Sequence, residues 1–189
     1  MPIDIENLKQ NFYDNFPTCI SNFNKCSYDD ANNVYLVSSL KECLNFDLVK
    51  NEILPGKQNF HSVDSLAFDK MNKKILFIEF KNSEYKKCKS NFIESSKDSF
   101  LIYRLIVSLI EKGTINCVKR KCIFVLDESK NSSTIASYNA CKRSNKLEEN
   151  TLYTYLKREL IDNKIFGNSY FDEIELCTQR NFDSIVSDI

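Results

Sequence analysis

Glycine, proline and histidine are scarce in this sequence. The 189 residues include three glycines, three prolines and one histidine, and tryptophan is absent. So few turn-forming residues argue against long disordered linkers and predict regular structure along most of the chain. With 42% apolar and 12% aromatic residues, the chain can bury a sizeable core. Its length predicts a single domain over residues 1–189.

A net charge is also lacking, because 26 acidic residues balance 26 basic ones. A protein that coats nucleic acid non-specifically carries an excess of basic residues, which release counterions from the phosphates. The balanced composition argues against that class. Any nucleic-acid partner must therefore be held by a local group of basic residues.

Metal-binding cysteine motifs are missing, although eight cysteines are present. They form no Cys-x-x-Cys pair, and His61 is the only histidine, so a structural zinc site is not expected. Cys43, Cys122 and Cys177 stand in apolar runs, and the N-terminus does not resemble a signal peptide. We expect reduced core thiols in a cytoplasmic protein, with disulfides as the less favoured alternative.

No hydrophobic run is long enough for a membrane span. The most apolar stretch, residues 99–110, carries Arg104. It is shorter than the roughly 20 apolar residues that a spanning helix needs. The run therefore predicts a buried core helix, and no membrane partner is expected.

The apolar periodicity predicts alternating helices and strands. Helices are predicted at residues 5–16, 30–50, 86–112 (closed by Gly113) and 151–164. Strands are predicted at residues 62–68, 74–81, 121–126 and 171–177, with a turn at Met71 and Asn72 between the first two. This order predicts an α/β protein, a three-layer sandwich with a central mixed sheet flanked by helices.

Two acids interrupt the first pair of predicted strands. Asp64 stands in one strand and Glu79 in the next, with Lys81 two places later. The turn between the strands sets a register that places Asp64 opposite Glu79, and the alternation of side chains puts Lys81 on the face of Glu79. Facing carboxylates repel each other, so a positive group should lie between them. Two carboxylates, the Phe80 carbonyl and a nearby ammonium form a hard-oxygen site suited to Mg²⁺ or Mn²⁺.

The stretch VDSLAF…ILFIEFK resembles the PD-(D/E)XK nuclease superfamily. In that superfamily an Asp at the start of one strand and an (Asp/Glu)-x-Lys on the next bind a divalent metal and cut phosphodiester bonds. The resemblance covers residues 30–126 and implies a restriction-endonuclease-like fold, with a helix and a strand at 150–178 as additions. The proline that usually precedes the Asp is Val63 here, at a position that varies in the family.

Carried over to this sequence, the resemblance implies a role for each residue of the motif. Asp64, Glu79 and the Phe80 carbonyl would bind the metal, and Lys81 would position or activate the attacking water. The family often adds an acid from the first core helix. Glu42 is the first candidate for it, and Asp47, which lies within the apolar stripe of that helix, is the alternative.

Four lysines follow the metal motif, at a place where a phosphate backbone could pass. They are Lys86, Lys87, Lys89 and Lys97. We predict that they contact nucleic acid; the alternative is an ordinary solvated start of a helix.

The resemblance thus implies a Mg²⁺- or Mn²⁺-dependent phosphodiesterase that hydrolyses nucleic acid, with DNA favoured over RNA by analogy. Endonucleolytic and exonucleolytic cleavage stay open, as does a protein partner or a homodimer. One alternative is an inactive nuclease-like fold that acts as a binding or inhibitory module. Another is an α/β interaction protein, with the charges at 64, 79 and 81 as an ion network and residues 171–189 as an acidic docking surface.

Overall fold

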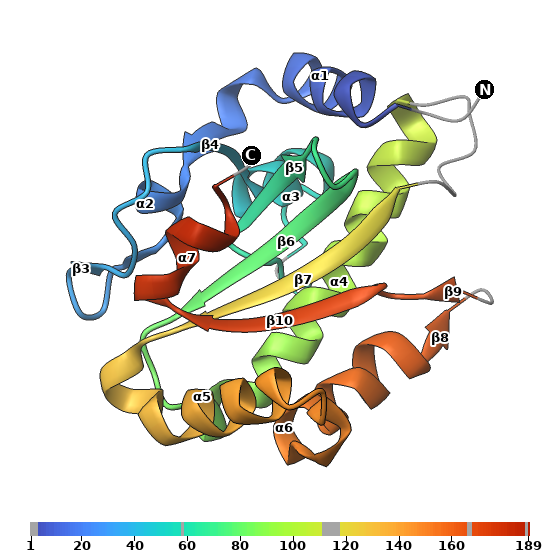
Figure 1. The fold of residues 1–189 in the computed structure, drawn as a ribbon. Coiled ribbons are helices and arrows are strands. Elements are labelled where there is room, and N and C mark those ends of the chain that lie inside the picture. Colours follow the sequence, from blue (N-terminus) through green and yellow to red (C-terminus); the bar gives the residue numbers. More distant parts are fainter. Residues whose placement is uncertain (1–3, 58, 111–117, 166–167, 188) are drawn as a thin grey trace.

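A mixed sheet of six strands forms the centre of the computed structural model, which describes residues 4–57, 59–110, 118–165, 168–187 and 189 (Figure 1). In spatial order its strands are β1 (Ile20–Asn22), β4 (Glu42–Asn45), β5 (Ser65–Asp69), β6 (Lys74–Lys81), β7 (Lys119–Leu126) and β10 (Glu173–Thr178). Three neighbouring pairs are antiparallel, namely β1–β4, β4–β5 and β5–β6. The remaining two pairs, β6–β7 and β7–β10, are parallel. Two short ladders lie outside the sheet: β2 (Tyr28–Asp29) with β3 (Val34–Tyr35), and β8 (Lys164–Ile165) with β9 (Asn168–Ser169).

Helices flank the sheet on both faces. The larger core lies under α1 (Ile5–Asn15), α3 (Phe46–Ile53), α4 (Tyr85–Ile110), α5 (Glu128–Arg143) and α6 (Thr151–Lys157). The smaller core lies under α2 (Phe23–Cys26) and α7 (Gln179–Ile185). Short helical turns η1 (Pro17–Cys19), η2 (Leu147–Glu149) and η3 (Arg158–Asp162) join these elements. The predicted α/β class, with a mixed central sheet between helices, is confirmed.

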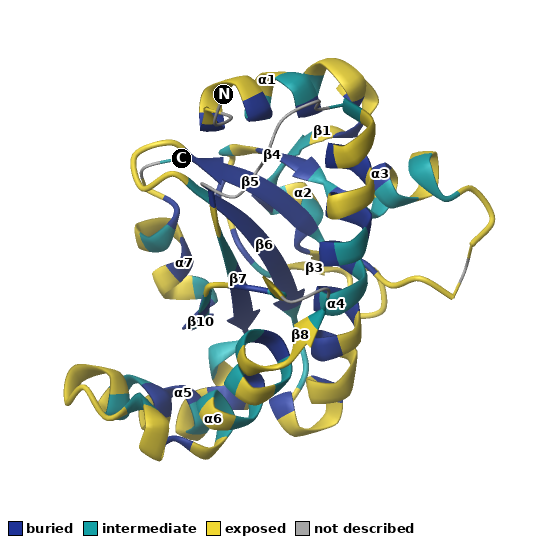
Figure 2. Ribbon diagram, turned by 90° about the vertical axis from the view of Figure 1, so that its right-hand side faces the viewer, coloured by how far each residue is buried: buried dark blue, intermediate teal, exposed yellow. Residues whose placement is uncertain are grey.

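The central strands are buried on both faces, which explains their nearly continuous apolar sequences (Figure 2). On the larger core, Phe77 of β6 meets Tyr103 of α4 with ring centroids 5.6 Å apart. The same ring lies 5.1 Å from Phe171, which precedes β10. Aromatic contacts therefore join the strand that carries Glu79 to elements far away in the sequence.

Helix α4 approaches the sheet closely because small serines face it. Ser95, Ser96 and Ser99 are buried, and the Ser96 hydroxyl lies 3.3 Å from the Cys122 sulfur on β7. Across the described ranges, no helix combines the length and the apolar character that a membrane crossing requires. The predicted end of this helix at Gly113 lies outside the described residues.

The predicted helix over residues 30–50 is wrong. This segment instead holds the end of the β2–β3 hairpin, β4 and the first half of α3. The hairpin turns because the Asp29 carboxylate accepts backbone N–H groups of the turn, and because Asn33 adopts a φ of 52° that asparagine tolerates. Leu40 is 75% exposed and Leu48 45% exposed, so the apolar stripe that suggested a helix faces solvent in two of its positions.

Other boundaries also differ from the prediction. Helix α5 was not predicted; it buries few apolar side chains, chiefly Ile135 and Tyr138, and starts at an Asp127 cap whose carboxylate accepts the Ser129 N–H at 2.7 Å. Helix α7 was not predicted either. The predicted helix over 151–164 is shorter, because α6 passes into the π-helical turn η3.

The cysteines of the described part are free thiols, as predicted. Most of them are buried, and Cys26 and Cys141 are partly exposed. Cys117 lies outside the described residues.

The packing of α1 on the sheet can be tested with Phe12→Ala. The Phe12 ring is fully buried and lies 5.5 Å from Phe68 and 5.9 Å from Tyr103. Its removal should lower the free energy of unfolding by about 3–5 kcal/mol, measured by urea denaturation. Phe60→Ala is the control, because that ring is 37% exposed. A loss below about 1 kcal/mol for Phe12→Ala would contradict the placement of α1.

Candidate active site

The β5–β6 hairpin has the register that the sequence predicts. Its ladder runs from Asp69 opposite Lys74 to Ser65 opposite Ile78. One further step along both strands brings Asp64 opposite Glu79. The two acids therefore meet at the open end of the hairpin, where β6 finishes and the loop into α4 begins.

Asp64 is fixed by three neighbouring elements. Its Oδ2 atom accepts the Phe80 N–H at 2.6 Å, and its carbonyl accepts the Phe46 N–H at the start of α3 at 3.1 Å. The preceding Val63 donates its N–H to the Ser99 hydroxyl of α4 at 2.8 Å. These contacts hold the half-buried carboxylate in one place before any ligand arrives.

Glu79 is the most deeply buried charged group at this edge. Its side chain is 1% exposed, and its Oε1 atom lies 2.6 Å from the Lys81 ammonium. Its Oε2 atom is also buried, and among the described residues it has no hydrogen-bond partner. Burial raises the pKa of Glu79, and the attraction of Lys81 offsets only part of that rise.

The three charges shift one another's pKa values. Burial raises the pKa of Asp64 well above its usual range, and the negative charge of Glu79 raises it further. Burial alone would lower the pKa of Lys81, but the two carboxylates outweigh burial, and the net change is upward. Lys81 therefore stays protonated at neutral pH, and one ammonium faces two acids.

The structure separates the two candidates for the upstream acid. Glu42 lies on β4 opposite Asn22, and its charge acts on Tyr13 of α1, whose pKa is raised by burial and then by Glu42. Along the strand it stands four residues, or about 13 Å, from the level of Asp64. The helix on which Glu42 was predicted to lie does not form, and Glu42 stands on β4 instead.

Asp47 lies much closer to the pair. It stands in the first turn of α3, where its carboxylate accepts the Ser62 hydroxyl and binds Lys50 at 3.3 Å. Its negative charge raises the pKa values of both Asp64 and Glu79. The alternative that the sequence left open is the acid that the fold brings toward the site.

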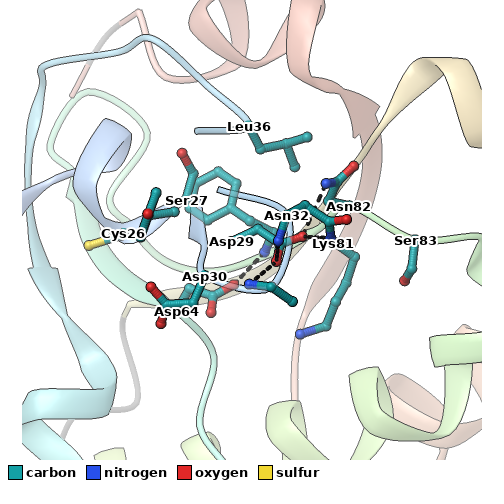
Figure 3. Close-up of a pocket in the computed structure, with 13 residues that line it drawn as sticks. Cys26, Ser27, Asp29, Asp30, Asn32, Leu36, Asp64, Lys81, Asn82 and Ser83 are labelled. Atoms are coloured by element: carbon teal, nitrogen blue, oxygen red, sulfur yellow. Dashed lines mark hydrogen bonds between the residues drawn. The ribbon is translucent and has the colours of Figure 1, made fainter. Parts of the chain in front are cut away.

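A cavity of ≈ 480 Å³ opens beside these charges (Figure 3). Asp64, Phe80 and Lys81 line one side of it, and residues 26–32 with Leu36 line the other. The Asp29 carboxylate accepts a hydrogen bond from the Asn82 side chain at 3.0 Å, which ties the β2–β3 hairpin to the end of β6. This wall lies in the segment for which a helix is predicted, although the turn residues Asp-Asp-Ala-Asn-Asn indicate a hairpin.

The predicted nucleic-acid contacts divide into two groups. Lys86, Lys87 and Lys89 are exposed on the first turns of α4, which starts four residues after Lys81. Lys97 instead binds Glu159 at 3.1 Å and so joins α4 to η3. Of the first three, Lys87 pairs with Glu84 at 3.4 Å, and Lys89 lies over the Tyr155 ring, 5.4 Å from its centroid.

The acids of the C-terminal segment are paired within the protein. Glu173 binds Lys74 at 2.7 Å, and Glu175 binds Lys121 at 3.2 Å. Asp172 binds Arg120 at 3.1 Å. These pairs neutralise much of the acidic docking surface that was considered for residues 171–189.

The donor atoms at this edge fit a divalent cation in their chemistry. Glu79 Oε2 is an unpartnered buried oxygen within the described part of the chain, and Asp64 supplies a second carboxylate. The Phe80 N–H points at Asp64, and the N–H and C=O of one strand residue point the same way, so its carbonyl also faces that side. The described residues assemble no group of three or more His, Cys, Asp or Glu side chains around one point.

The repulsion at this site predicts an unusual effect of pH. An acid whose pKa is raised by folding destabilises the folded state once pH exceeds its unfolded value, near 4. In metal-free buffer, Asp64→Asn should therefore melt at or above wild type at pH 7, by a few degrees. The difference should shrink as pH falls toward 4, because wild-type Asp64 is then protonated. Scanning calorimetry from pH 4 to pH 8 measures this.

Glu79→Gln is the matched comparison. The pKa of Glu79 is raised as well, because Lys81 offsets only part of the effect of burial. By the same linkage, we expect Glu79→Gln to melt at or above wild type at pH 7, with a difference that shrinks toward pH 4. A clear drop in melting temperature for Asp64→Asn at pH 7 would contradict the raised pKa.

No protein-family model, no curated protein and no solved structure matches the chain. The site consists of two carboxylates with raised pKa values, one cationic lysine and a cavity that Asp64 and Lys81 border.

Proposed function

We propose that the protein is a metal-dependent nuclease that hydrolyses phosphodiester bonds of nucleic acid. The observation that carries this proposal is the buried Glu79 carboxylate, which keeps one oxygen unpartnered among the described residues while Asp64 stands across from it. Two acids with raised pKa values are costly in a protein without a counter-charge. A bound divalent cation would relieve that cost.

The arrangement of the strands supports the same proposal. Antiparallel β4, β5 and β6 are followed by α4 and by β7, which is parallel to β6. The order β5, β6, α4 and β7 agrees with part of the restriction-endonuclease-like core that the sequence resemblance implies, whereas β3, β4 and the start of α3 replace the core helix expected over residues 30–50. The charges also lie at the carboxyl ends of β6 and β7, the edge where open α/β sheets bind their ligands.

The proposed metal ligands are Asp64, Glu79 and the Phe80 carbonyl, with Asp47 in place of Glu42 as the further acid. A bound Mg²⁺ or Mn²⁺ would stabilise charge on the phosphate and lower the pKa of a bound water. Both cations prefer hard oxygen ligands, which this set provides. The Phe80 N–H keeps Asp64 Oδ2 in position, which leaves the other carboxylate oxygen for the cation.

Lys81 acts as a cation in this proposal. Its raised pKa keeps it protonated, so it donates hydrogen bonds rather than accepting a proton from water. From its place beside Glu79 it would orient a water and stabilise the charge that develops on the phosphate oxygens. Its contact with a buried carboxylate limits the positions that the ammonium can take.

The surface beside the site suits a phosphate backbone. Lys86, Lys87 and Lys89 lie on the first turns of α4, and the N-terminus of a long helix also attracts anions. These charges are local, in keeping with a chain whose total charge is balanced. DNA is proposed ahead of RNA by analogy with the superfamily.

Lys81→Met separates metal binding from cleavage. This variant should reduce cleavage by at least about 100-fold, because it removes the charge at the reacting phosphate. It should still bind Mn²⁺ in calorimetric titration, because no proposed ligand is lost. Asp64→Asn should lose both Mn²⁺ binding and cleavage. Lys146→Met is the control, because Lys146 pairs with Glu149 on the surface.

Single-stranded DNA, duplex DNA and RNA should all be offered as substrates in that test. Absence of cleavage of all three, together with absence of Mn²⁺ binding, would overturn the proposal. Mn²⁺ binding without cleavage by wild type would favour the alternative function, an inactive nuclease-like module that binds a partner.

Replacement of Lys86, Lys87 and Lys89 by Gln tests the path of the nucleic acid. The triple variant should bind the nucleic acid that wild type cleaves more weakly. The magnitude of the slope of log affinity against log salt concentration should fall by up to about three. Mn²⁺ binding should not change. Equal salt slopes for variant and wild type in a fluorescence-anisotropy titration would place the phosphates elsewhere.

A further inference from the structure

Two thiols meet beside the cavity. Cys26 ends α2 and Cys43 lies on β4, and their sulfur atoms are 3.7 Å apart. The contact arises because β1 pairs with β4 through Ser21 and Cys43, and α2 follows β1 directly. The other cysteine contacts described for this chain are with serine, threonine, glutamate or the backbone.

The two cysteines differ in exposure. Cys26 is partly exposed and lines the cavity, whereas Cys43 is buried beneath it in the smaller core. Figure 3 shows the Cys26 sulfur directed away from Asp64 and Lys81. Cys26 is thus the more accessible thiol of the pair, and Cys43 lies behind it.

We propose that Cys26 and Cys43 are an oxidisable dithiol that closes to a disulfide when a small disulfide such as oxidised glutathione reacts with the partly exposed Cys26. The sulfur atoms must approach by about 1.7 Å, from 3.7 Å to the bonded distance of about 2.0 Å. This dithiol is separate from the carboxylates and does not depend on the proposed nuclease activity.

The exchange proceeds in two balanced steps. The Cys26 thiol loses its proton and attacks one sulfur of oxidised glutathione, which gives a mixed disulfide and releases one glutathione thiolate. The Cys43 thiol then loses its proton and attacks the Cys26 sulfur, which forms the protein disulfide and releases a second thiolate. The two released thiolates take up the two protons, so the protein loses two electrons and glutathione gains them.

The difference in pKa between the two thiols agrees with Cys26 reacting before Cys43. The hydrogen bond from Cys43 lowers the pKa of Cys26, and the same contact together with burial raises the pKa of Cys43. Cys26 is thus the better initial nucleophile, and Cys43 resolves the mixed disulfide.

The bond would fix one wall of the cavity. Cys26 precedes the hairpin whose residues 27–32 line the cavity opposite Asp64, and Cys43 belongs to the central sheet. A covalent link between them anchors the entry of the hairpin to β4. The wall that borders the candidate site then depends on the redox state of the surroundings.

Disulfide mapping of the full-length protein tests the proposal. Native protein is treated with oxidised glutathione, its free thiols are alkylated, and a tryptic digest is analysed by mass spectrometry. The expected product joins peptide 26–41 to peptide 42–50, because trypsin cuts between them at Lys41. The oxidised protein should also melt about 5–10 °C higher, because the bond closes a loop in the unfolded chain.

Three variants provide the controls. Cys43→Ser should accumulate a glutathione adduct at Cys26, whereas Cys26→Ser should give no adduct at the buried Cys43. Cys141→Ser should form the bond as wild type does, because Cys141 is partly exposed but outside the pair. Recovery of both wild-type peptides fully alkylated after the treatment, or a bond between another pair, would overturn the proposal without any bearing on nuclease activity.

Discussion

The candidate site depends on one buried contact, the ion pair between Glu79 and Lys81 at the end of β6. Removing a carboxylate from water is unfavourable, and a single ammonium shared between Glu79 and Asp64 compensates for it incompletely. The aromatic packing around Phe77, two residues earlier on the same face, holds the strand where this burial occurs. The stability of the core therefore maintains an electrostatic arrangement that is unfavourable in itself, which is typical of sites that bind a charged ligand.

Polar side chains replace glycine and proline in building the loops around this site. Asparagine and aspartate cap helices by accepting free N–H groups, at Asn22, Asn45, Asp127 and Asn150. The buried Asn131 amide accepts the Tyr85 N–H and donates to the Ser83 carbonyl, which fixes the loop between β6 and α4. The loops next to Lys81 are thus held by side-chain hydrogen bonds, and their geometry is set by neighbours far away in the sequence.

The cavity lies between the residues proposed for metal-dependent cleavage and the residues proposed for thiol oxidation. Asp64 and Lys81 line the side at the ends of β5 and β6, and Cys26 lines the side that leads into the β2–β3 hairpin. Oxygen ligands suit a hard cation and exclude soft ones, whereas the thiol pair reacts with disulfides. The two proposed processes use different atoms, on opposite sides of a cavity whose hairpin wall Asn82 ties to the end of β6.

The sequence by itself determined the β5–β6 hairpin, its register and the meeting of Asp64 with Glu79. Those features are local, since a short turn and the alternation of side chains set them. It did not determine β4 or the upstream acid, because Leu44 fits a helical stripe as well as a strand buried on both faces. Only pairing with β1 and β5, which are distant in the chain, selects the strand. The tertiary structure also brought Cys26 to Cys43 and the hairpin to Asn82, because these contacts form when separate elements pack together and leave no periodic pattern in the sequence.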